Sequence, residues 1–290
     1  MLHTIKNNDL TVTVSEMGAE LQSILSADGT EYLWQGDPAY WKKRSPNLFP
    51  YIGRMPDKTY YLDGQKYQMP IHGFAPTSLF RLVKKSNTQL VFELTENEET
   101  YSYYPRKFAF RVGYELQGKK LTVSFIAENR DEKTMYFSMG GHPGFRLPLA
   151  DGCVFEDYRL RFAGKCLPMR VLFDADCFVS GTAPYPLQDD CILPLTHDLF
   201  DNDAVVLENS GASVTLETDK DSHGITVEYP QMKYVGFWHT TKSDAPFVCV
   251  EPWSALPSRS GITESLETQP DLNALEPGCQ TSNIWTITIK

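Results

Sequence analysis

The sequence lacks the features that mark several large classes of protein. It has no run of about 18 apolar residues, so we expect no membrane-spanning helix and no membrane partner. Lysine and arginine form no basic run and the net charge is −10, which argues against nucleic acid as a partner. These absences favour a soluble globular protein.

Metal-binding and nucleotide-binding motifs are also missing. The six cysteines form no C-x-x-C pair and their spacing resembles no zinc site. The H-E-x-x-H, EF-hand, P-loop and G-x-S-x-G motifs do not occur. No charged-then-apolar signal segment begins the chain. We therefore expect free thiols in a reducing cytoplasm, no metal and no cofactor.

Helical periodicity is scarce. Glu96–Tyr104 is predicted as a short helix, which Pro105 would end. Strands and helices do not alternate, which argues against a doubly wound parallel sheet. Hydrophobic residues make up 41% of the chain, enough for a sizeable core.

Two-residue alternation of apolar and polar residues is what the chain has instead, and it predicts strands. The turn residues Asp63-Gly64, Gln117-Gly118 and Asn209–Gly211 predict three hairpins. The predicted strands are 10–14, 60–62, 65–67, 108–116, 119–127, 205–207, 213–218, 225–229, 234–238, 247–250 and 284–289. We predict an all-β chain, one β-sandwich domain over residues 1–290. Residues 176–203, the most irregular stretch, are interpreted as a long loop over the site or as a crossing at a sheet edge.

Three short segments carry candidate acid–base side chains. His72 precedes Gly73, and the alternative is a buried histidine bonded to a carbonyl. His142 lies among four nearby glycine and proline residues, a stretch that lets an imidazole approach a ligand closely. Glu251 follows an apolar run and precedes Pro252-Trp253, which suggests a tuned base; the alternative is a strand-end glutamate in water. One acid and two imidazoles favour proton transfer on a small polar substrate.

Other polar residues are weaker candidates. Arg54 follows a glycine near aromatic residues, so its forked donors suit vicinal hydroxyls, or it forms a structural ion pair. Asp203 accepts hydroxyl bonds or simply caps a turn. His239 follows Trp238 and is expected near the site, whereas His197 and His223 are expected in solvent.

Four segments together resemble the aldose 1-epimerase (galactose mutarotase) family, most closely its LacX-like branch. They are Ser45–Arg54, Met69–Ala75, Gly141–Phe145 and Val250–Trp253, and the resemblance spans nearly the whole chain. It implies a galactose-mutarotase-like supersandwich of two large, mostly antiparallel sheets with few short helices. Gly53 and Gly141 stand where the well-studied galactose mutarotases carry asparagine.

The resemblance also implies roles and a reaction. Glu251 would be the base, His142 the acid and His72 a binding and polarising group. Arg54, Asp203 and Trp238 would contact the sugar. The implied protein is a monomer or homodimer that interconverts the α and β anomers of a hexose without a cofactor. A hexose-6-phosphate 1-epimerase, served by Lys42, Lys43 and Arg44 at the cleft mouth, and a non-catalytic sugar-binding protein are the alternatives.

Ordinary pKa values give an expectation for the charges of the acid–base pair. Glutamate, at about 4.3, is ionised near neutrality, and histidine, at about 6.5, is mostly neutral. A nearby carboxylate favours the imidazolium ion. The expected resting state is therefore an ionised Glu251 beside a protonated His142.

Overall fold

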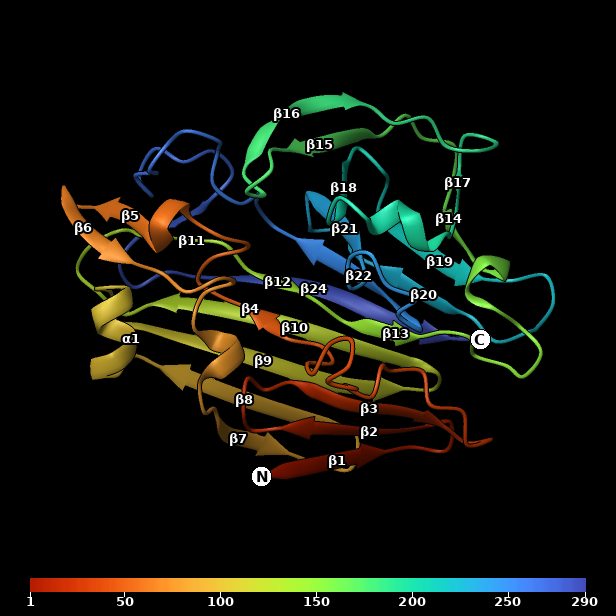
Figure 1. Ribbon diagram of the computed structural model, residues 1–290. Coiled ribbons are helices and arrows are strands. Elements are labelled where there is room, and N and C mark those ends of the chain that lie inside the picture. Colours follow the sequence, from red (N-terminus) through yellow and green to blue (C-terminus); the bar gives the residue numbers. More distant parts are fainter.

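Alternating apolar residues build two large antiparallel sheets (Figure 1). The structure, a computed structural model, describes residues 1–290. The nine-stranded sheet runs in the order β17 (Ile192–Pro194), β14 (Arg159–Phe162), β19 (Ser213–Glu217), β20 (Ile225–Glu228), β24 (Gln280–Ile289), β10 (Lys120–Asn129), β9 (Phe108–Gln117), β8 (Gln89–Thr95) and β7 (Arg81–Lys85). The eight-stranded sheet runs in the order β16 (Val179–Pro184), β15 (Met169–Phe173), β18 (Val205–Glu208), β21 (Tyr234–Trp238), β22 (Phe247–Trp253), β12 (Gly140–Gly141) and β4 (Asn47–Leu48), and β13 (Gly144–Arg146) also pairs with β22.

Smaller elements flank these sheets. They are a three-stranded sheet of β1 (Leu2–Lys6), β2 (Leu10–Ser15) and β3 (Leu21–Ser26), and the pairs β5 (Thr59–Leu62) with β6 (Gln65–Gln68) and β11 (Met135–Phe137) with β23 (Asn273–Leu275). The single α-helix, α1 (Glu98–Tyr103), confirms the predicted helix, and Asn97 and Thr100 form its capping box. Four short 3-10 segments complete the fold: Pro56–Lys58, Ala75–Thr77, Phe155–Asp157 and His197–Phe200. No helix is long and apolar enough to cross a membrane.

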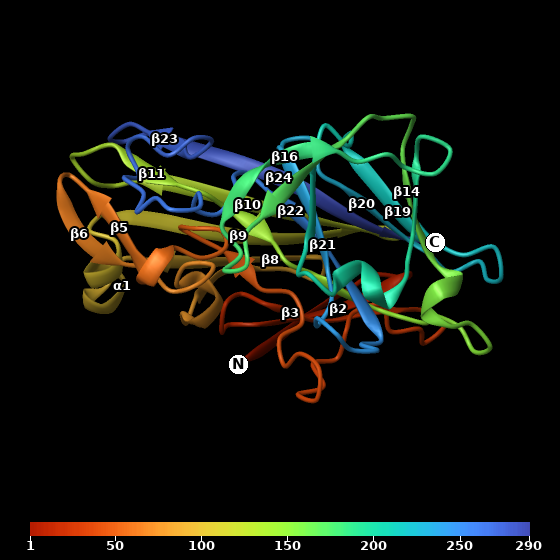
Figure 2. The same cartoon turned by 45° about the horizontal axis from the view of Figure 1, so that its top comes forward.

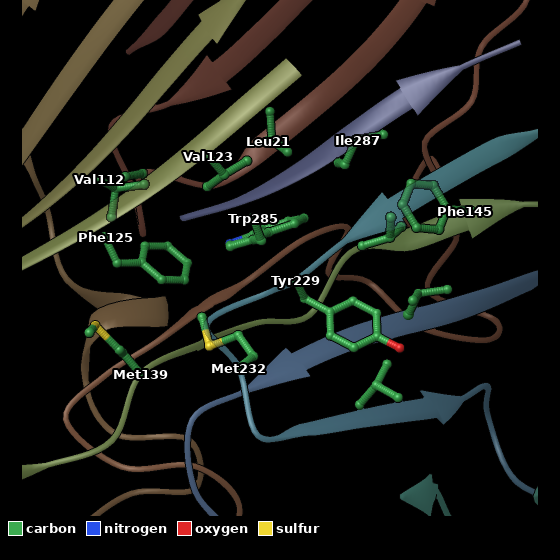
Figure 3. Packing of buried hydrophobic residues seen from close by; sticks show 14 of the residues in the cluster. Leu21, Val112, Val123, Phe125, Met139, Phe145, Tyr229, Met232, Trp285 and Ile287 are labelled. Atoms are coloured by element: carbon green, nitrogen blue, oxygen red, sulfur yellow. The ribbon is translucent and has the colours of Figure 1, made fainter. Parts of the chain in front are cut away.

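The main core lies between the two large sheets (Figure 2). One cluster of 62 buried residues extends along the chain from Ile5 to Ile289. Phe125 of β10 and Trp285 of β24 point into this space in Figure 3. The predicted all-β class with two large antiparallel sheets is confirmed.

The opposite, outer face of the eight-stranded sheet is where the candidate site forms. Because side chains alternate along a strand, Val248 and Val250 of β22 enter the main core while Cys249 and Glu251 point outward. On β21, Val235 and Phe237 likewise face the core, so Trp238 lies on the outer face. One periodicity therefore supplies both the core and a row of outward side chains.

Two of the three predicted hairpins are confirmed. Asp63-Gly64 joins β5 to β6, and the segment around Gly118 joins β9 to β10. The third prediction is wrong: β18 pairs with β15 and β21, whereas β19 pairs with β14 and β20 in the other sheet. Asn209 and Gly211 do adopt the left-handed backbone of a turn, with φ of 59° and 83°. That turn carries the chain from one sheet to the other.

Residues 176–203 follow the second of their two interpretations. They contain β16, at the edge of the eight-stranded sheet, and β17, at the edge of the nine-stranded sheet. The segment is thus a crossing between edges, and it reaches the site cavity with Cys177 and Asp203. All six cysteines are free.

Candidate active site

Strand register brings His142 and Glu251 together. Gly140 of β12 pairs with Trp253, and Gly144 of β13 pairs with Cys249, so His142 between them lies directly across from Glu251. The Nε2 atom of His142 is 3.1 Å from the Oε2 atom of Glu251. Glu251 lies inside β22, which continues to Trp253, so it is not the strand-end residue that the sequence suggested.

Small residues make room for this pair. On the other side of Glu251, Gly236 of β21 is its register partner, and a Cβ atom there would meet Glu251 Cβ at 3.4 Å. Beside His142, a Cβ atom on Gly141 would lie 2.6 Å from the indole ring of Trp285. The departure from asparagine at Gly141 therefore has a steric reason, because Trp285 occupies the space that a side chain needs.

Glu251 and His142 are both buried, and each has a polar atom without a hydrogen-bond partner. Glu251 is 1% exposed and His142 is 8% exposed. Neither Oε2 of Glu251 nor Nδ1 of His142 has a hydrogen-bond partner that meets normal geometry. Unsatisfied buried polar atoms are uncommon in proteins and call for an explanation, such as a ligand. Here both atoms belong to groups that line the cavity.

Burial reverses the expected charges of the pair. It raises the pKa of the Glu251 carboxyl well above its usual value, and the negative charge of Asp203 adds to this. It lowers the pKa of His142 well below its usual value, and the charge of a protonated His72 would lower it further. The expected ion pair is therefore wrong for the free protein: a neutral carboxyl beside a neutral imidazole is favoured.

His72 is held by its backbone and by one ring nitrogen. The backbone N–H of Gly53 donates to His72 Nδ1 at 3.1 Å, and His72 N–H donates to the carbonyl of Gly53 at 2.7 Å. Because Nδ1 accepts, the ring is neutral and carries its proton on Nε2. Burial, with the nearby positive charge of Arg54, lowers the pKa of His72 to about 4. The two imidazoles meet edge to face, with ring centroids 5.5 Å apart.

One cavity of about 470 Å³ is lined by all six residues to which the family resemblance gives a role. Small-molecule sites typically measure about 300–1,000 Å³. Arg54 is exposed at this cavity and has no carboxylate partner, so the structural ion pair considered for it does not form. Asp203, with a φ of 75°, accepts a hydrogen bond from the thiol of Cys177 at 2.9 Å. The selected residues that line the cavity are Arg54, His72, His142, Asp203, Trp238 and Glu251.

Sequence reasoning missed several cavity residues. Trp41 stacks on the His142 ring at 5.0 Å between centroids, and Cys177 holds Asp203. Trp253 also lines the wall. Trp41 and Cys177 lie in loops without a motif, so no local signal placed them near the acid–base pair. Trp253 was visible only as a neighbour of Glu251.

The remaining histidines do not behave as predicted. His239 is fully buried but lies outside the cavity lining; its ring bonds to the carbonyl of Thr240 and to His197. His197, expected in solvent, is only partly exposed and stacks on Phe155 with centroids 4.2 Å apart. His223 is likewise partly buried and bonds to Asp221 at 2.7 Å.

Comparison with known proteins defines the class to which this fold and cavity belong. Residues 1–267 match the aldose 1-epimerase family, and the chain belongs to that family. The family is one of sugar epimerases, so the chain is grouped with isomerase-type enzymes. This confirms the family resemblance seen in the four sequence segments.

Particular relatives match over their full lengths. The chain is 32% identical to protein LacX of Lactococcus lactis subsp. lactis, in its plasmid and chromosomal forms, over 98% of each chain. A galactose mutarotase related enzyme from Lactobacillus acidophilus is 34% identical with a TM-score of 0.95, over 100% of this chain and 97% of that one. A galactose mutarotase-like protein from Lactobacillus casei is 32% identical with a TM-score of 0.95 over the whole of both chains. The galactose-mutarotase-like fold is thereby confirmed.

Proposed function

We propose that the protein is an aldose 1-epimerase that interconverts the α and β anomers of a hexose. The observation that carries the proposal is the register-paired Glu251 and His142, buried 3.1 Å apart in a cavity of small-molecule size. Membership of the aldose 1-epimerase family supports the same reaction class. The two groups are suited to move one proton each in opposite directions.

The proposed reaction is ring opening and closure. The Glu251 carboxylate takes the proton from the anomeric hydroxyl while protonated His142 delivers a proton to the ring oxygen, and the bond between C1 and the ring oxygen breaks. Rotation about the C1–C2 bond turns the aldehyde, and the proton transfers then run in reverse. Each positioned proton transfer contributes about 10²–10⁴-fold. Electrons and protons balance without an oxidant.

The neighbouring groups provide binding and orientation in this proposal. The Nε2–H of His72 is free to donate to a sugar oxygen, since its Nδ1 is occupied by Gly53. Arg54 offers forked donors to hydroxyls, and Asp203 accepts from them. Trp238, with its ring centroid 5.7 Å from that of His142, forms an aromatic wall.

A phosphorylated hexose is the second candidate substrate, favoured by one observation. Arg54 is a cavity cation without a carboxylate partner. Of the three cations suggested by the sequence, only Lys43 lines the cavity, and its amine donates to the carbonyl of Pro76 at 3.0 Å. Comparing rates on hexoses and their 6-phosphates decides between the two substrates.

The base assignment is tested with Glu251→Gln. This variant keeps the shape of the side chain but cannot take a proton, so polarimetry on freshly dissolved α-glucose and α-galactose should show at least a 100-fold loss of rate. Cys153→Ala, outside the cavity, is the control. Full activity in Glu251→Gln would rule out Glu251 as the catalytic base. Calorimetric sugar binding by a wild-type protein that catalyses no mutarotation would favour a non-catalytic sugar-binding protein.

A further inference from the structure

Cys249 places a third potential metal ligand beside the acid–base pair. It lies two residues before Glu251 on the same outer face of β22. One ligand atom from each of Cys249, His142 and Glu251 lies within 4.8 Å of the others, and all three residues are buried. Strand β22 thus supplies a thiol and a carboxylate two residues apart, and the fold brings the imidazole of the distant His142 beside them.

The carboxylate of this group lacks a complete set of hydrogen bonds. Glu251 Oε2 lies 3.1 Å from His142 Nε2 but makes no hydrogen bond of normal geometry. Both residues are buried, with Glu251 1% and His142 8% exposed. A cation bound between the three residues would bond to the carboxylate and the imidazole and remove part of this deficit. Unlike Glu251 and His142, Cys249 has no part in the proposed sugar chemistry; its side chain packs in an apolar cluster with Trp34, Ala245 and Phe247.

The donor set selects the kind of ion. Sulfur, nitrogen and oxygen together suit Zn²⁺, whereas Mg²⁺ and Ca²⁺ prefer oxygen ligands. Zinc bonds of about 2.0–2.3 Å put tetrahedral ligand atoms roughly 3.3–3.7 Å apart, so small side-chain rotations suffice. A thiolate and a carboxylate would neutralise the two positive charges, which suits a buried position.

We propose that Cys249, His142 and Glu251 form a binding site for a thiophilic divalent cation such as Zn²⁺, which switches the protein off. The ion would occupy the atoms that transfer protons to and from the sugar, so metal and sugar would compete. The binding site stands on geometry alone; only its inhibitory effect rests on the proposed function.

Binding of the ion would release a proton, because a thiol that binds a metal must first lose its proton.

A titration with Co²⁺, a spectroscopic substitute for Zn²⁺, tests the site without using activity. The wild-type protein should show one equivalent of Co²⁺ with a near-ultraviolet thiolate-to-metal charge-transfer band, which Zn²⁺ displaces. The near-isosteric Cys249→Ser should lose this band. Cys177→Ala, which removes the thiol exposed at the same cavity, is the matched control and should keep it. A Co²⁺ complex without the thiolate band, or a band unchanged in Cys249→Ser, would overturn the proposal.

Inhibition is measured separately by polarimetry. Zn²⁺ should inhibit wild-type mutarotation reversibly, with recovery on adding a chelator, and more sugar should weaken the inhibition. Cys249→Ser should raise the half-inhibitory Zn²⁺ concentration about 100-fold or more, since even loss of an outer partner costs about 10–100-fold in metal affinity. Equal Zn²⁺ sensitivity in the variant and wild type would refute the switch. If the protein catalyses no mutarotation at all, the Co²⁺ spectrum still decides the metal site.

Discussion

At the scale of single residues, the proposed reaction depends on which of the two residues, Glu251 or His142, holds the proton that they share. In the proposed reaction the pair is ionised while the sugar ring is closed, and neutral while the sugar is an open aldehyde. Both forms hold the same number of protons. Burial raises the pKa of Glu251 and lowers that of His142, which favours the neutral form. The environment would thereby stabilise the stage at which the ring is open.

The pH profile of kcat/KM should have a wide plateau. On the acidic side, burial lowers the pKa of His142, so activity should persist below pH 6.5 and fall towards pH 4, where His72 gains a proton and loses its bond from Gly53. On the basic side, burial and the charge of Asp203 raise the pKa of Glu251 well above the ordinary glutamate value of 4.5. The pair should therefore lose its shared proton only at a pH well above 4.5. Polarimetry across pH measures both limits. Activity that already falls between pH 7 and 6 would contradict this environment for His142.

Asp203→Asn tests the origin of the basic limit. Removing the negative charge lowers the pKa of Glu251, so the basic limb should move to lower pH. The KM for sugar should rise if Asp203 also accepts hydroxyl bonds. Asp201→Asn, outside the cavity lining, is the control. An unmoved limb with an unchanged KM would remove Asp203 from both proposed roles.

At the scale of elements, the turn that carries His72 depends on glycine. His72 and Gly73 both have positive φ, of 62° and 73°. A Cβ atom on Gly73 would lie 2.2 Å from the carbonyl oxygen of Phe49. Backbone strain of this kind persists only where the surroundings enforce it, and it is common at functional sites. The contact with Phe49 therefore fixes the position of the His72 turn.

Gly73→Ala and Gly64→Ala form a matched pair of substitutions. Gly64 has a similar φ of 70°, but its Cβ would meet nothing within 4 Å, so its replacement should cost about 1–2 kcal/mol. Gly73→Ala adds a backbone clash and should cost about 3 kcal/mol or more. Urea unfolding measures both. Equal losses of stability would show that the clash relaxes freely.

Local sequence patterns predicted the helices, strands and turns better than they predicted which strands pair and which side chains meet. The turn around Asn209–Gly211 was correctly located, but which strands pair beyond it depends on contacts with β15 and β14, distant in sequence. Glu251 and His142 were found because their motifs are local. Trp41 was not, because only folding stacks it on His142. The expected charges of Glu251 and His142 were wrong for the same reason, because the burial that shifts their pKa values exists only in the folded protein.

At the scale of the whole molecule, one core joins the two large sheets and the three-stranded sheet. The 62-residue cluster includes Val12 of β2, Val123 of β10 and Val250 of β22, which belong to three different sheets. A continuous core of this kind couples the sheets energetically. It supports, without testing it, the expectation of one domain over residues 1–290.

Thermal or urea unfolding should therefore be a single cooperative transition. Four of the five tryptophans, 34, 41, 238 and 253, lie in or beside the cavity face, whereas Trp285 lies in the main core. Tryptophan fluorescence and far-ultraviolet circular dichroism should give the same midpoint, because coincident probes are the mark of two-state behaviour. Two separated transitions would instead divide the chain into independent units.

The position of β24 has a consequence for synthesis on the ribosome. This strand lies between β20 and β10 in the nine-stranded sheet, yet it follows every other strand along the chain. The nascent polypeptide must therefore hold both neighbouring edges unpaired until β24 emerges. Unpaired edges recruit strands from other molecules. We therefore expect aggregation of the nascent chain to be favoured most in the interval between the translation of β20 and that of β24.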